Sequence, residues 1–159
     1  MSEEVFQNIK EFLDEKNVEY TYFNHRPVKT SKEAAEVRDM TVEEGLKRGA
    51  KAMVIRSEGE YYMFVLPANK KIDFGSIRDI LDTDSVSLAD PEKVKDITGC
   101  KVGGVPPFGN LFDIPVFVDP LLFENDKIDF NAGMRTVSME LEADEWRRAV
   151  DSVVVGFSM

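Results

Sequence analysis

The residues from Val102 to Asn110 form the stretch of the sequence that is best suited to chemistry. The stretch reads VGGVPPFGN. Its adjacent glycines, Gly103 and Gly104, allow positive φ angles and a close approach of another molecule to the backbone, and the two prolines that follow stiffen the chain. A rigid loop of this kind can direct backbone N–H groups at a carbonyl oxygen, as an oxyanion site does. A structural turn between strands has the same composition, so both interpretations stay open.

Lys51 and His25 are the side chains that could act beside such a loop. Lys51 stands at the start of an apolar run, from which it could reach solvent or place its ammonium group in a cleft as a point charge. His25 is the only histidine, and no nucleophile pairs recognisably with it, so no Ser-His-Asp triad is assigned. Cys100 is the only cysteine, and one cysteine with one histidine cannot form a usual zinc site. We therefore expect neither a metal nor a cofactor.

Short helices and hairpin-forming strands must position these residues. Residues 5–17 place apolar side chains at helical spacing, and Thr30 and Thr41 each begin a sequence typical of a helix-capping box. The apolar runs 51–57 and 60–66 flank Gly59 and predict a β-hairpin. Further helices are expected at 74–81, from 91 onward and at 144–150, and further strands at 20–23, 115–118, 127–130, 134–140 and 153–155.

This order of elements predicts a single α+β domain over residues 1–159. The sheet is expected to be mixed and largely antiparallel, with helices packed outside it. A dinucleotide-binding fold is not expected, because the sequence has neither a Gly-x-Gly-x-x-Gly motif nor a phosphate loop. It also has no apolar window of about 20 residues and no signal-peptide pattern at its start, so we expect a cytoplasmic protein without a membrane partner.

The charge of the chain is uneven along the sequence. It carries 20 basic and 30 acidic residues, a net charge of −10, which argues against general coating of DNA or RNA. Residues 26–56 nevertheless contain eight basic and five acidic residues, a balance of +3, whereas residues 111–145 contain two basic and nine acidic residues, a balance of −7. A local basic face could meet a few phosphates. Ordinary solvated surface is the alternative.

An ordered set of motifs resembles the YbaK/prolyl-tRNA-synthetase-associated editing-domain family. The resemblance covers about residues 5–150, nearly the whole chain. The motifs are His25 with TSKEAA at 30–35, Lys51 opening an apolar strand, VLPA at 65–68 with KID at 71–73, TGCKVGGVPPFG at 98–109, Val118-Asp119, and Ala132-Gly133 before a closing strand.

The resemblance implies a free-standing aminoacyl-tRNA deacylase, which hydrolyses the ester between a wrong amino acid and the 3′-terminal adenosine of a tRNA. It also implies a partly barrel-like mixed sheet surrounded by helices, and a site without metal, cofactor or protein nucleophile. Lys51 matches the family's lysine, and Gly103 and Gly104 match its catalytic loop. The other residues expected to bind substrate are His25, Thr30, Met53, Val105, Pro107, Phe108, Gly109, Asp119 and Gly133. Many relatives have a serine where this chain has Pro106, so that hydroxyl is missing.

This chemistry agrees with the residues that the sequence lacks. An aminoacyl ester is already activated, orientation can supply about 7–11 kcal/mol, and one well-directed oxyanion donor about 2.7–4 kcal/mol. A pocket separates amino acids that differ by one methylene by only about 1–3 kcal/mol, so exclusion of the larger cognate residue predicts a small substrate, such as Ala or Cys on tRNA(Pro). The expected partners are the tRNA 3′ end and an aminoacyl-tRNA synthetase. A non-catalytic tRNA- or synthetase-binding module, or a domain that binds a small anion, are the alternatives.

Overall fold

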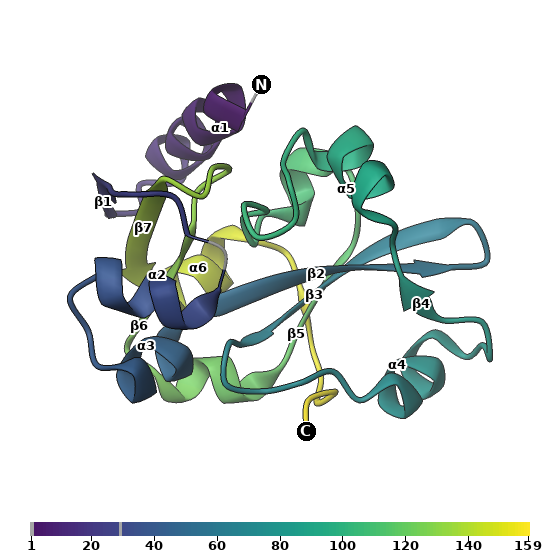
Figure 1. Cartoon of the computed structure of the whole chain (residues 1–159). Helices are drawn as coiled ribbons and strands as arrows, with labels where there is room; N and C mark the ends of the chain where they lie inside the picture. Colours follow the sequence, from purple (N-terminus) through teal and green to yellow (C-terminus); the bar gives the residue numbers. More distant parts are fainter. Residues whose placement is uncertain (1, 29) are drawn as a thin grey trace.

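The computed structural model describes residues 2–28 and 30–159 (Figure 1). The helices are α1 (Ser2–Glu15), α2 (Ser31–Val37), α3 (Val42–Arg48), α4 (Phe74–Leu81), α5 (Pro91–Thr98) and α6 (Ala143–Ala149), with the 3-10 helices η1 (Gly109–Phe112) and η2 (Pro120–Glu124). The strands are β1 (Thr21–Asn24), β2 (Ala50–Ser57), β3 (Glu60–Pro67), β4 (Ser87–Leu88), β5 (Val116–Val118), β6 (Lys127–Asn131), β7 (Val137–Glu142) and β8 (Val153–Val154). Within these two ranges, no helix has the length and apolar character needed to cross a bilayer.

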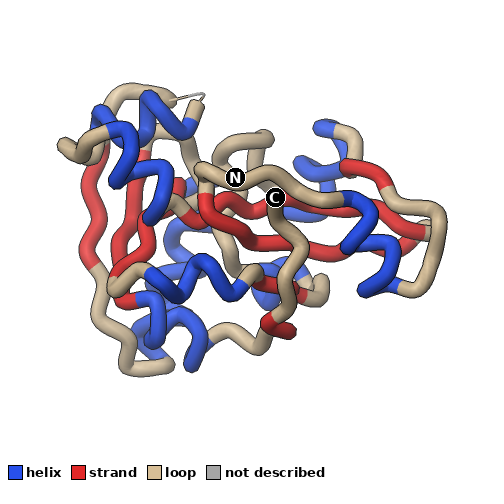
Figure 2. Tube along the Cα trace, turned by 90° about the horizontal axis from the view of Figure 1, so that it is seen from below, coloured by secondary structure: helices blue, strands red, loops and turns tan. Residues whose placement is uncertain are grey.

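The strands form two sheets. One is antiparallel with the order β1-β7-β6, and the other is mixed with the order β4-β2-β3-β5-β8, in which the β3–β5 and β5–β8 pairs are parallel. Figure 2 shows the sheets side by side, with the long β2–β3 hairpin extending away from the shorter sheet. A parallel bridge between Gly49 and Asp129 joins the start of β2 to β6. The predicted α+β class and mixed sheet are confirmed, although the described strands do not close into a barrel.

Strand β3 is buried on both faces. Because side chains alternate along a strand, Met63 and Val65 join the main core, whereas Phe64 and Leu66 join a second apolar cluster with Ile77 of α4. Burial on both faces explains why β3 reads as an almost continuous apolar run. Strand β2 pairs with this run, so β2 and its residue Lys51 also lie between the main core and the second apolar cluster.

The threonine caps of the two capping sequences and the hairpin turn form as predicted. The Thr30 and Thr41 hydroxyls accept hydrogen bonds from the backbone N–H groups three residues later, each at 3.1 Å. Helices α2 and α3 can pack closely because Gly45 has no Cβ. A Cβ at this position would lie only 2.3 Å from Cβ of Ala35. The hairpin turns at Glu58 and Gly59, whose φ angles of 49° and 81° are those of a two-residue turn that matches the strand twist.

The end of the described chain is tied to the segment before α4. The N–H of Asp73 donates to the carbonyl of Phe157 at 2.8 Å, and Lys71 and Met159 exchange two backbone hydrogen bonds of 3.0 and 2.8 Å. Strand β8, which precedes this tie, covers the edge of β5. Strand β8, near the end of the sequence, therefore completes a sheet whose first strand, β2, begins at Ala50.

Candidate functional site

A cavity of about 200 Å³ lies where the α2–α3 pair, the start of β2, the glycine loop and β6 meet. Much of its wall is made of residues with small side chains: Ala34, Gly45, Gly49, Ala50, Ala52, Ala68 and Gly103. Polar groups come from Thr30, Arg38, Lys51, Asp129 and Asn131, and the larger apolar contacts from Met53, Val102, Val105 and Phe130. The cavity therefore combines a narrow apolar wall with cationic and hydrogen-bonding groups.

Lys51 lies at the start of β2, opposite Leu66 of β3, and is partly buried. Its Nζ donates a hydrogen bond of 2.8 Å to the carbonyl of Lys70. Burial, together with the nearby charge of Lys71, lowers the pKa of the Lys51 ammonium group. Because an ammonium group has three N–H donors, the contact with Lys70 leaves donors that can bind a ligand in the cavity.

The glycine loop forms a tight turn beside Lys51. The N–H of Gly104 donates to the carbonyl of Lys101 at 2.8 Å, and Gly103 has a φ of +92°. These are the features of a type II turn, which needs glycine at its third position. The N–H of Gly104 is thus occupied, whereas no acceptor within the described part of the chain engages the N–H of Gly103 or Val105. Both of these residues line the cavity.

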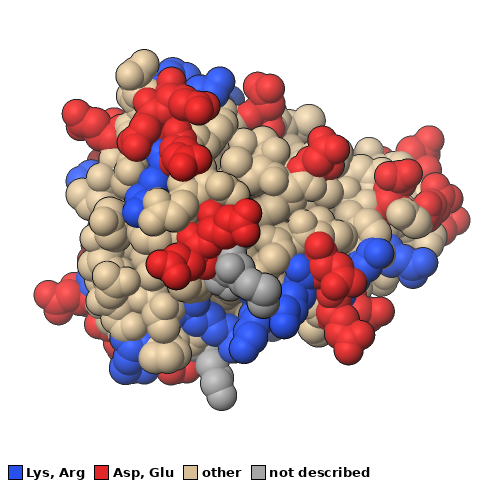
Figure 3. All heavy atoms as spheres, turned by 90° about the horizontal axis from the view of Figure 1, so that it is seen from above, with Lys and Arg blue, Asp and Glu red and all other residues tan. Residues whose placement is uncertain are grey.

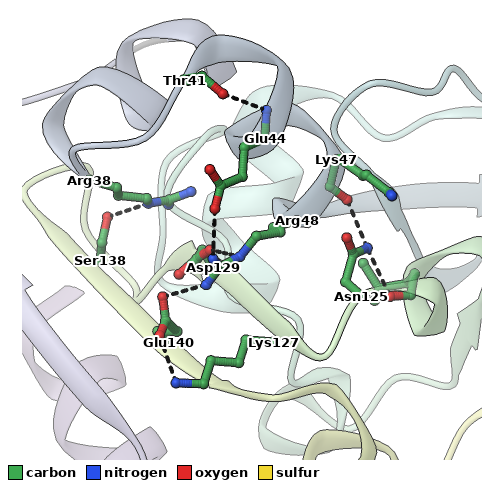
Figure 4. Close-up of polar contacts among 11 residues, drawn as sticks. Arg38, Thr41, Glu44, Lys47, Arg48, Asn125, Lys127, Asp129, Ser138 and Glu140 are labelled. Atoms are coloured by element: carbon green, nitrogen blue, oxygen red, sulfur yellow. Dashed lines mark hydrogen bonds and ion pairs between the residues drawn. The ribbon is translucent and has the colours of Figure 1, made fainter.

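A chain of polar side chains connects this turn to Arg38, which follows α2. Arg38 donates from Nη2 to Oδ1 of Asn131 at 3.2 Å, and Nδ2 of Asn131 donates to the carbonyl of Gly103 at 2.6 Å. Arg38 also donates from Nε to Oγ of Ser138 at 2.8 Å (Figure 4). Because arginine only donates and a carbonyl only accepts, the orientation of the Asn131 amide follows from its two partners.

His25 does not line the cavity but contacts the same chain of polar side chains through Ser138. Its Nδ1 bonds the carbonyl of Arg26 at 2.7 Å and must therefore carry the hydrogen. In the neutral ring Nε2 then accepts from Oγ of Ser138, 2.8 Å away. Burial, opposed by the carbonyl of Arg26 and reinforced by the charge of Arg38, lowers the pKa of His25. His25 is consequently neutral at pH 7 and supports the Arg38–Ser138 contact.

An ion cluster lies beneath the cavity, between α3 and the β6–β7 pair (Figure 4). Arg48 forms ion pairs with Glu44 at 3.1 Å, Asp129 at 3.1 Å and Glu140 at 2.6 Å, and Lys127 lies 3.6 Å from Glu140. Asp129 is only 2% exposed. Burial and a hydrogen bond with Glu140 raise the pKa of Asp129 to about 7, against the influence of Arg48. Three carboxyl groups, those of Glu44, Asp129 and Glu140, thus surround Arg48 at this end of the cavity.

The structure brings together five of the predicted site residues. Lys51, Gly103, Thr30, Met53 and Val105 all line the cavity. Met53 also packs against the second apolar cluster, so it has a core role in addition. Gly104 and Gly133 lie behind the turn, where a Cβ on Gly104 would sit 3.4 Å from the carbonyl oxygen of Gly133. The expected meeting of the lysine with the glycine loop is therefore present.

Four other predicted residues do not line the cavity, and the structure gives them packing contacts. Phe108 is fully buried between the rings of Phe12 and Phe130. The carbonyl of Pro107 accepts a hydrogen bond of 2.9 Å from the indole of Trp146. A Cβ on Gly109 would lie 2.5 Å from a methyl carbon of Val116. These residues, with Asp119, hold the core that supports the site.

Asp119 is a buried tie between β5 and the end of the described chain. Its Oδ1 accepts from the N–H of Leu121 at 2.9 Å, and its Oδ2 accepts from the N–H groups of Phe157 and Ser158, both at 3.0 Å. Burial by itself would raise the pKa of Asp119, but the hydrogen bonds from Phe157, Leu121 and Ser158 outweigh it and the pKa is lowered. This carboxylate therefore stabilises the fold at a distance from the cavity.

Sequence reasoning did not find four polar residues of the site: Arg38, Asp129, Asn131 and Ser138. One signal was present in β6, where Asp129 and Asn131 alternate with apolar residues and so had to share a face of the strand. Arg38 and Ser138 gave no local signal, because their contact joins residues distant in sequence. No three acidic, histidine or cysteine side chains of the described ranges gather as metal ligands would.

Basic and acidic side chains are distributed unevenly on the surface. In Figure 3, basic side chains form a broken band along one side of the visible face, and acidic side chains are scattered over the remainder and interrupt the band. A band of this kind can meet a few phosphates but not a long polyanion.

Comparison with known proteins assigns the family. A model of the aminoacyl-tRNA editing domain matches residues 25–149. The multifunctional Ser/Thr-tRNA deacylase ProXp-y of Escherichia coli strain K12 is 30% identical over 156 residues, covering 95% of this chain and 91% of that protein. The prolyl-tRNA editing protein ProX of Acetoanaerobium sticklandii is 27% identical over 117 residues, covering 71% of this chain and 68% of that protein.

A solved structure shows the same fold. The crystal structure of a proposed trans-editing enzyme for prolyl-tRNA synthetase superposes with a TM-score of 0.82 at 20% identity, covering 98% of this chain and 97% of that chain. The motifs in the sequence, the match of the family model and the fold agree with one another. The chain therefore belongs to the aminoacyl-tRNA editing domain family, an enzyme family that hydrolyses the ester bond of mischarged tRNA.

Proposed function

We propose that the protein is an aminoacyl-tRNA deacylase that removes a small, wrong amino acid from a tRNA, with the cavity beside Lys51 as its active site. The observation that carries this proposal is that Lys51 and the glycine turn line one cavity. The aminoacyl group enters the cavity, and the terminal adenosine of the tRNA lies at its mouth. The proposed location is the cytoplasm, and an aminoacyl-tRNA synthetase is a proposed second partner.

The proposed reaction needs no nucleophile from the protein. The N–H groups of Gly103 and Val105 receive the ester carbonyl oxygen, and Lys51 binds the terminal ribose-phosphate or the same carbonyl. A water molecule, oriented by the free ribose hydroxyl, then attacks the activated carbonyl carbon. The bond between that carbon and the ribose oxygen breaks, the amino acid leaves as its carboxylate, and the ribose oxygen takes up a proton from the water. Ser138, the hydroxyl paired with His25, is 1% exposed and does not line the cavity, so its part is structural. One well-directed oxyanion donor contributes about 2.7–4 kcal/mol to such a reaction.

The size and lining of the cavity support a small substrate side chain. Walls of glycine and alanine around a cavity of about 200 Å³ offer a small side chain close contact, and contact with these walls is the proposed means of excluding a larger residue. Exclusion of a larger cognate residue predicts a small amino acid such as Ala or Cys on tRNA(Pro), whereas the name of the E. coli relative specifies Ser and Thr. Thr30 and Asn131 bring hydrogen-bonding groups to the cavity, which favours a hydroxyl-bearing residue, so the panel of substrates must contain all four amino acids.

A deacylation assay on tRNAs charged with Ala, Cys, Ser or Thr tests the proposal. We expect turnover of at least one of these esters, and replacement of Lys51 by Ala should lower the rate by about 10²–10³-fold, the loss seen when a transition-state donor is removed. The thermal midpoint of this variant should stay near that of the wild type. Lys95→Ala, which changes an exposed lysine on α5, is the matched control.

The outcomes separate the alternatives. Turnover that depends on Lys51 supports the deacylase. Binding of tRNA or of a synthetase without turnover would instead indicate a non-catalytic module. The relevant difference from active relatives would then be Pro106, where many of them have a serine. A folded Lys51→Ala variant with full activity would overturn the assigned role of the lysine.

A further inference from the structure

We propose that Arg135 is a positioning residue that directs and polarises the Val102–Gly103 peptide, so that the N–H of Gly103 faces the reacting carbonyl. The proposal rests on the proposed deacylase function and adds a residue that sequence reasoning did not select. Arg135 lies in the turn between β6 and β7 and does not line the cavity. Its action is therefore through the turn rather than on the substrate.

The guanidinium group of Arg135 holds the carbonyl of Val102 with two donors. Nε donates at 3.0 Å, and Nη2 donates to the same oxygen. Two donors from one rigid plane fix the direction of a carbonyl more strictly than one donor on a flexible side chain. The plane of the Val102–Gly103 peptide is therefore set by Arg135.

A glycine is needed at position 103 for this contact as well as for the turn. A Cβ on Gly103 would lie 3.3 Å from Nε of Arg135, which is a crowded approach, and the φ of +92° is strained for other residues. The turn conformation and the close approach of Arg135 thus both require glycine at position 103.

The direction of the Gly103 N–H follows from the direction of the Val102 carbonyl. No cis peptide bond occurs in the described chain, and in a trans peptide the N–H and C=O point in opposite directions. With the carbonyl on Arg135, the N–H of Gly103 points away from the β6–β7 turn. The N–H of Gly104 is occupied by Lys101, and the two prolines that follow have no N–H. Gly103 therefore supplies the donor that the arginine controls.

The β6–β7 hairpin also holds the Gly103–Gly104 peptide, which follows the one that Arg135 binds. Asn131, at the end of β6, donates to the carbonyl of Gly103 at 2.6 Å. Both carbonyls that flank the N–H and Cα of Gly103 are thus bound by side chains of the β6–β7 hairpin. A charged donor on a carbonyl also polarises the peptide and strengthens its N–H as a donor, an effect that Arg135 can provide and the neutral Asn131 provides less.

Kinetics of Arg135 variants test the proposal. Arg135→Ala should lower kcat for deacylation by about 10–100-fold, as expected for a misplaced catalytic group, with KM and the thermal midpoint close to those of the wild type. Arg135→Lys should recover part of kcat, because one ammonium donor can replace part of the guanidinium contact. Arg78→Ala, which removes an exposed arginine of α4 outside the site, should leave both constants unchanged.

Chemical rescue and a spectrum provide readouts that a merely structural role would not change. Millimolar guanidinium should raise kcat of Arg135→Ala and should not raise that of the wild type or of Lys51→Ala. In protein labelled with ¹⁵N-glycine, the amide signal of Gly103 should move in Arg135→Ala and return towards its position when guanidinium is added. Should the alanine variant fail to fold, Arg135→Gln, which keeps one amide donor, takes its place in both measurements.

The outcomes distinguish this proposal from the proposed function. Absence of deacylation by the wild type would defeat the proposed function itself. An active wild type together with a folded Arg135→Ala variant of equal kcat, or a Gly103 amide signal that does not respond to guanidinium, would overturn the role of Arg135 alone. A raised KM with unchanged kcat would also overturn it, because that result indicates binding of substrate rather than orientation of the turn.

Discussion

The two halves of the glycine–proline stretch have opposite positions in the molecule. Residues 101–105, the turn half, lie at the cavity, and their backbone is held by Asn131 and Arg135. Residues 107–109, the buried half, lie in the core, where Phe108 is fully buried and Pro107 binds Trp146. A uniform composition of glycine, proline and apolar residues thus serves two different purposes within one short segment.

The difference shows that the surroundings of a glycine decide its purpose. Gly103 is required by a positive φ and by the approach of an arginine, whereas Gly109 is required because β5 leaves no space for a Cβ. The first requirement concerns the shape of a site and the second the density of a core. Substitutions in the two halves should therefore separate activity from stability.

The largest loss of stability is expected from Phe108→Ala. The ring packs against Phe12 and Phe130, and removal of a buried aromatic ring costs about 3–5 kcal/mol. Urea denaturation should show this loss, while the folded fraction keeps a near-normal kcat. A variant that loses kcat without losing stability would place Phe108 in the site and remove the distinction between the halves.

A smaller loss is expected from Gly109→Ala. The added Cβ would meet the Val116 methyl carbon at 2.5 Å and the Ile114 carbonyl oxygen at 2.9 Å, and overpacking of a core costs about 1–3 kcal/mol. The thermal midpoint should fall and kcat at a temperature of full folding should not. Unchanged stability would mean that β5 can move away from η1 without cost.

Gly103→Ala should have a smaller effect on stability and a clear effect on rate. A positive φ costs a residue with a Cβ about 1–2 kcal/mol, and the displaced Arg135 no longer directs the turn, so kcat should fall by about 10–100-fold. Gly59→Ala is the matched control, because Gly59 has a φ of +81° and open space around it. Gly59→Ala should lose similar stability and keep its kcat, and equal rates for both variants would contradict the role of the turn half.

The last prediction concerns the pH dependence that Asp119 gives to the free energy of unfolding. This dependence has the smallest effect at neutral pH. The folded pKa of this carboxyl lies below its unfolded value, so its contribution is complete above the unfolded pKa of about 3.9 and is lost as the pH falls through the folded pKa. The free energy of unfolding of the wild type should therefore fall below about pH 4. Asp119→Asn should show a weaker dependence in that range, and parallel curves would assign the acid sensitivity to other carboxyl groups.

Much of the fold could be predicted from the sequence because its signals are local. Helix α4, the capping hydroxyls of Thr30 and Thr41 and the hairpin at Gly59 depend on residues within a few positions of one another. Strand β4 was missed because its two residues are a strand only through pairing with β2. The strand expected at 134–140 is found at Val137–Glu142, because the chain first turns at Gly133, whose φ is +91°.

The site could be predicted only in part. Lys51 and the glycine turn were found through their place in an ordered set of motifs, but Arg38 and Arg135 act through partners that are distant in the sequence. Composition also could not divide the glycine–proline stretch into its two halves. That division depends on which neighbours surround each residue, and those neighbours come from β5, β6 and α6.

The late completion of the mixed sheet has a consequence for biosynthesis. Strand β3 leaves the ribosome with β2 as its hairpin partner, but β5 and then β8 follow only much later in the chain. Until they arrive, the apolar edge of the hairpin is open to pairing with another nascent chain. Slow translation of the region between β3 and β5, or a shortage of chaperones that shield apolar segments, should therefore reduce the yield of native protein.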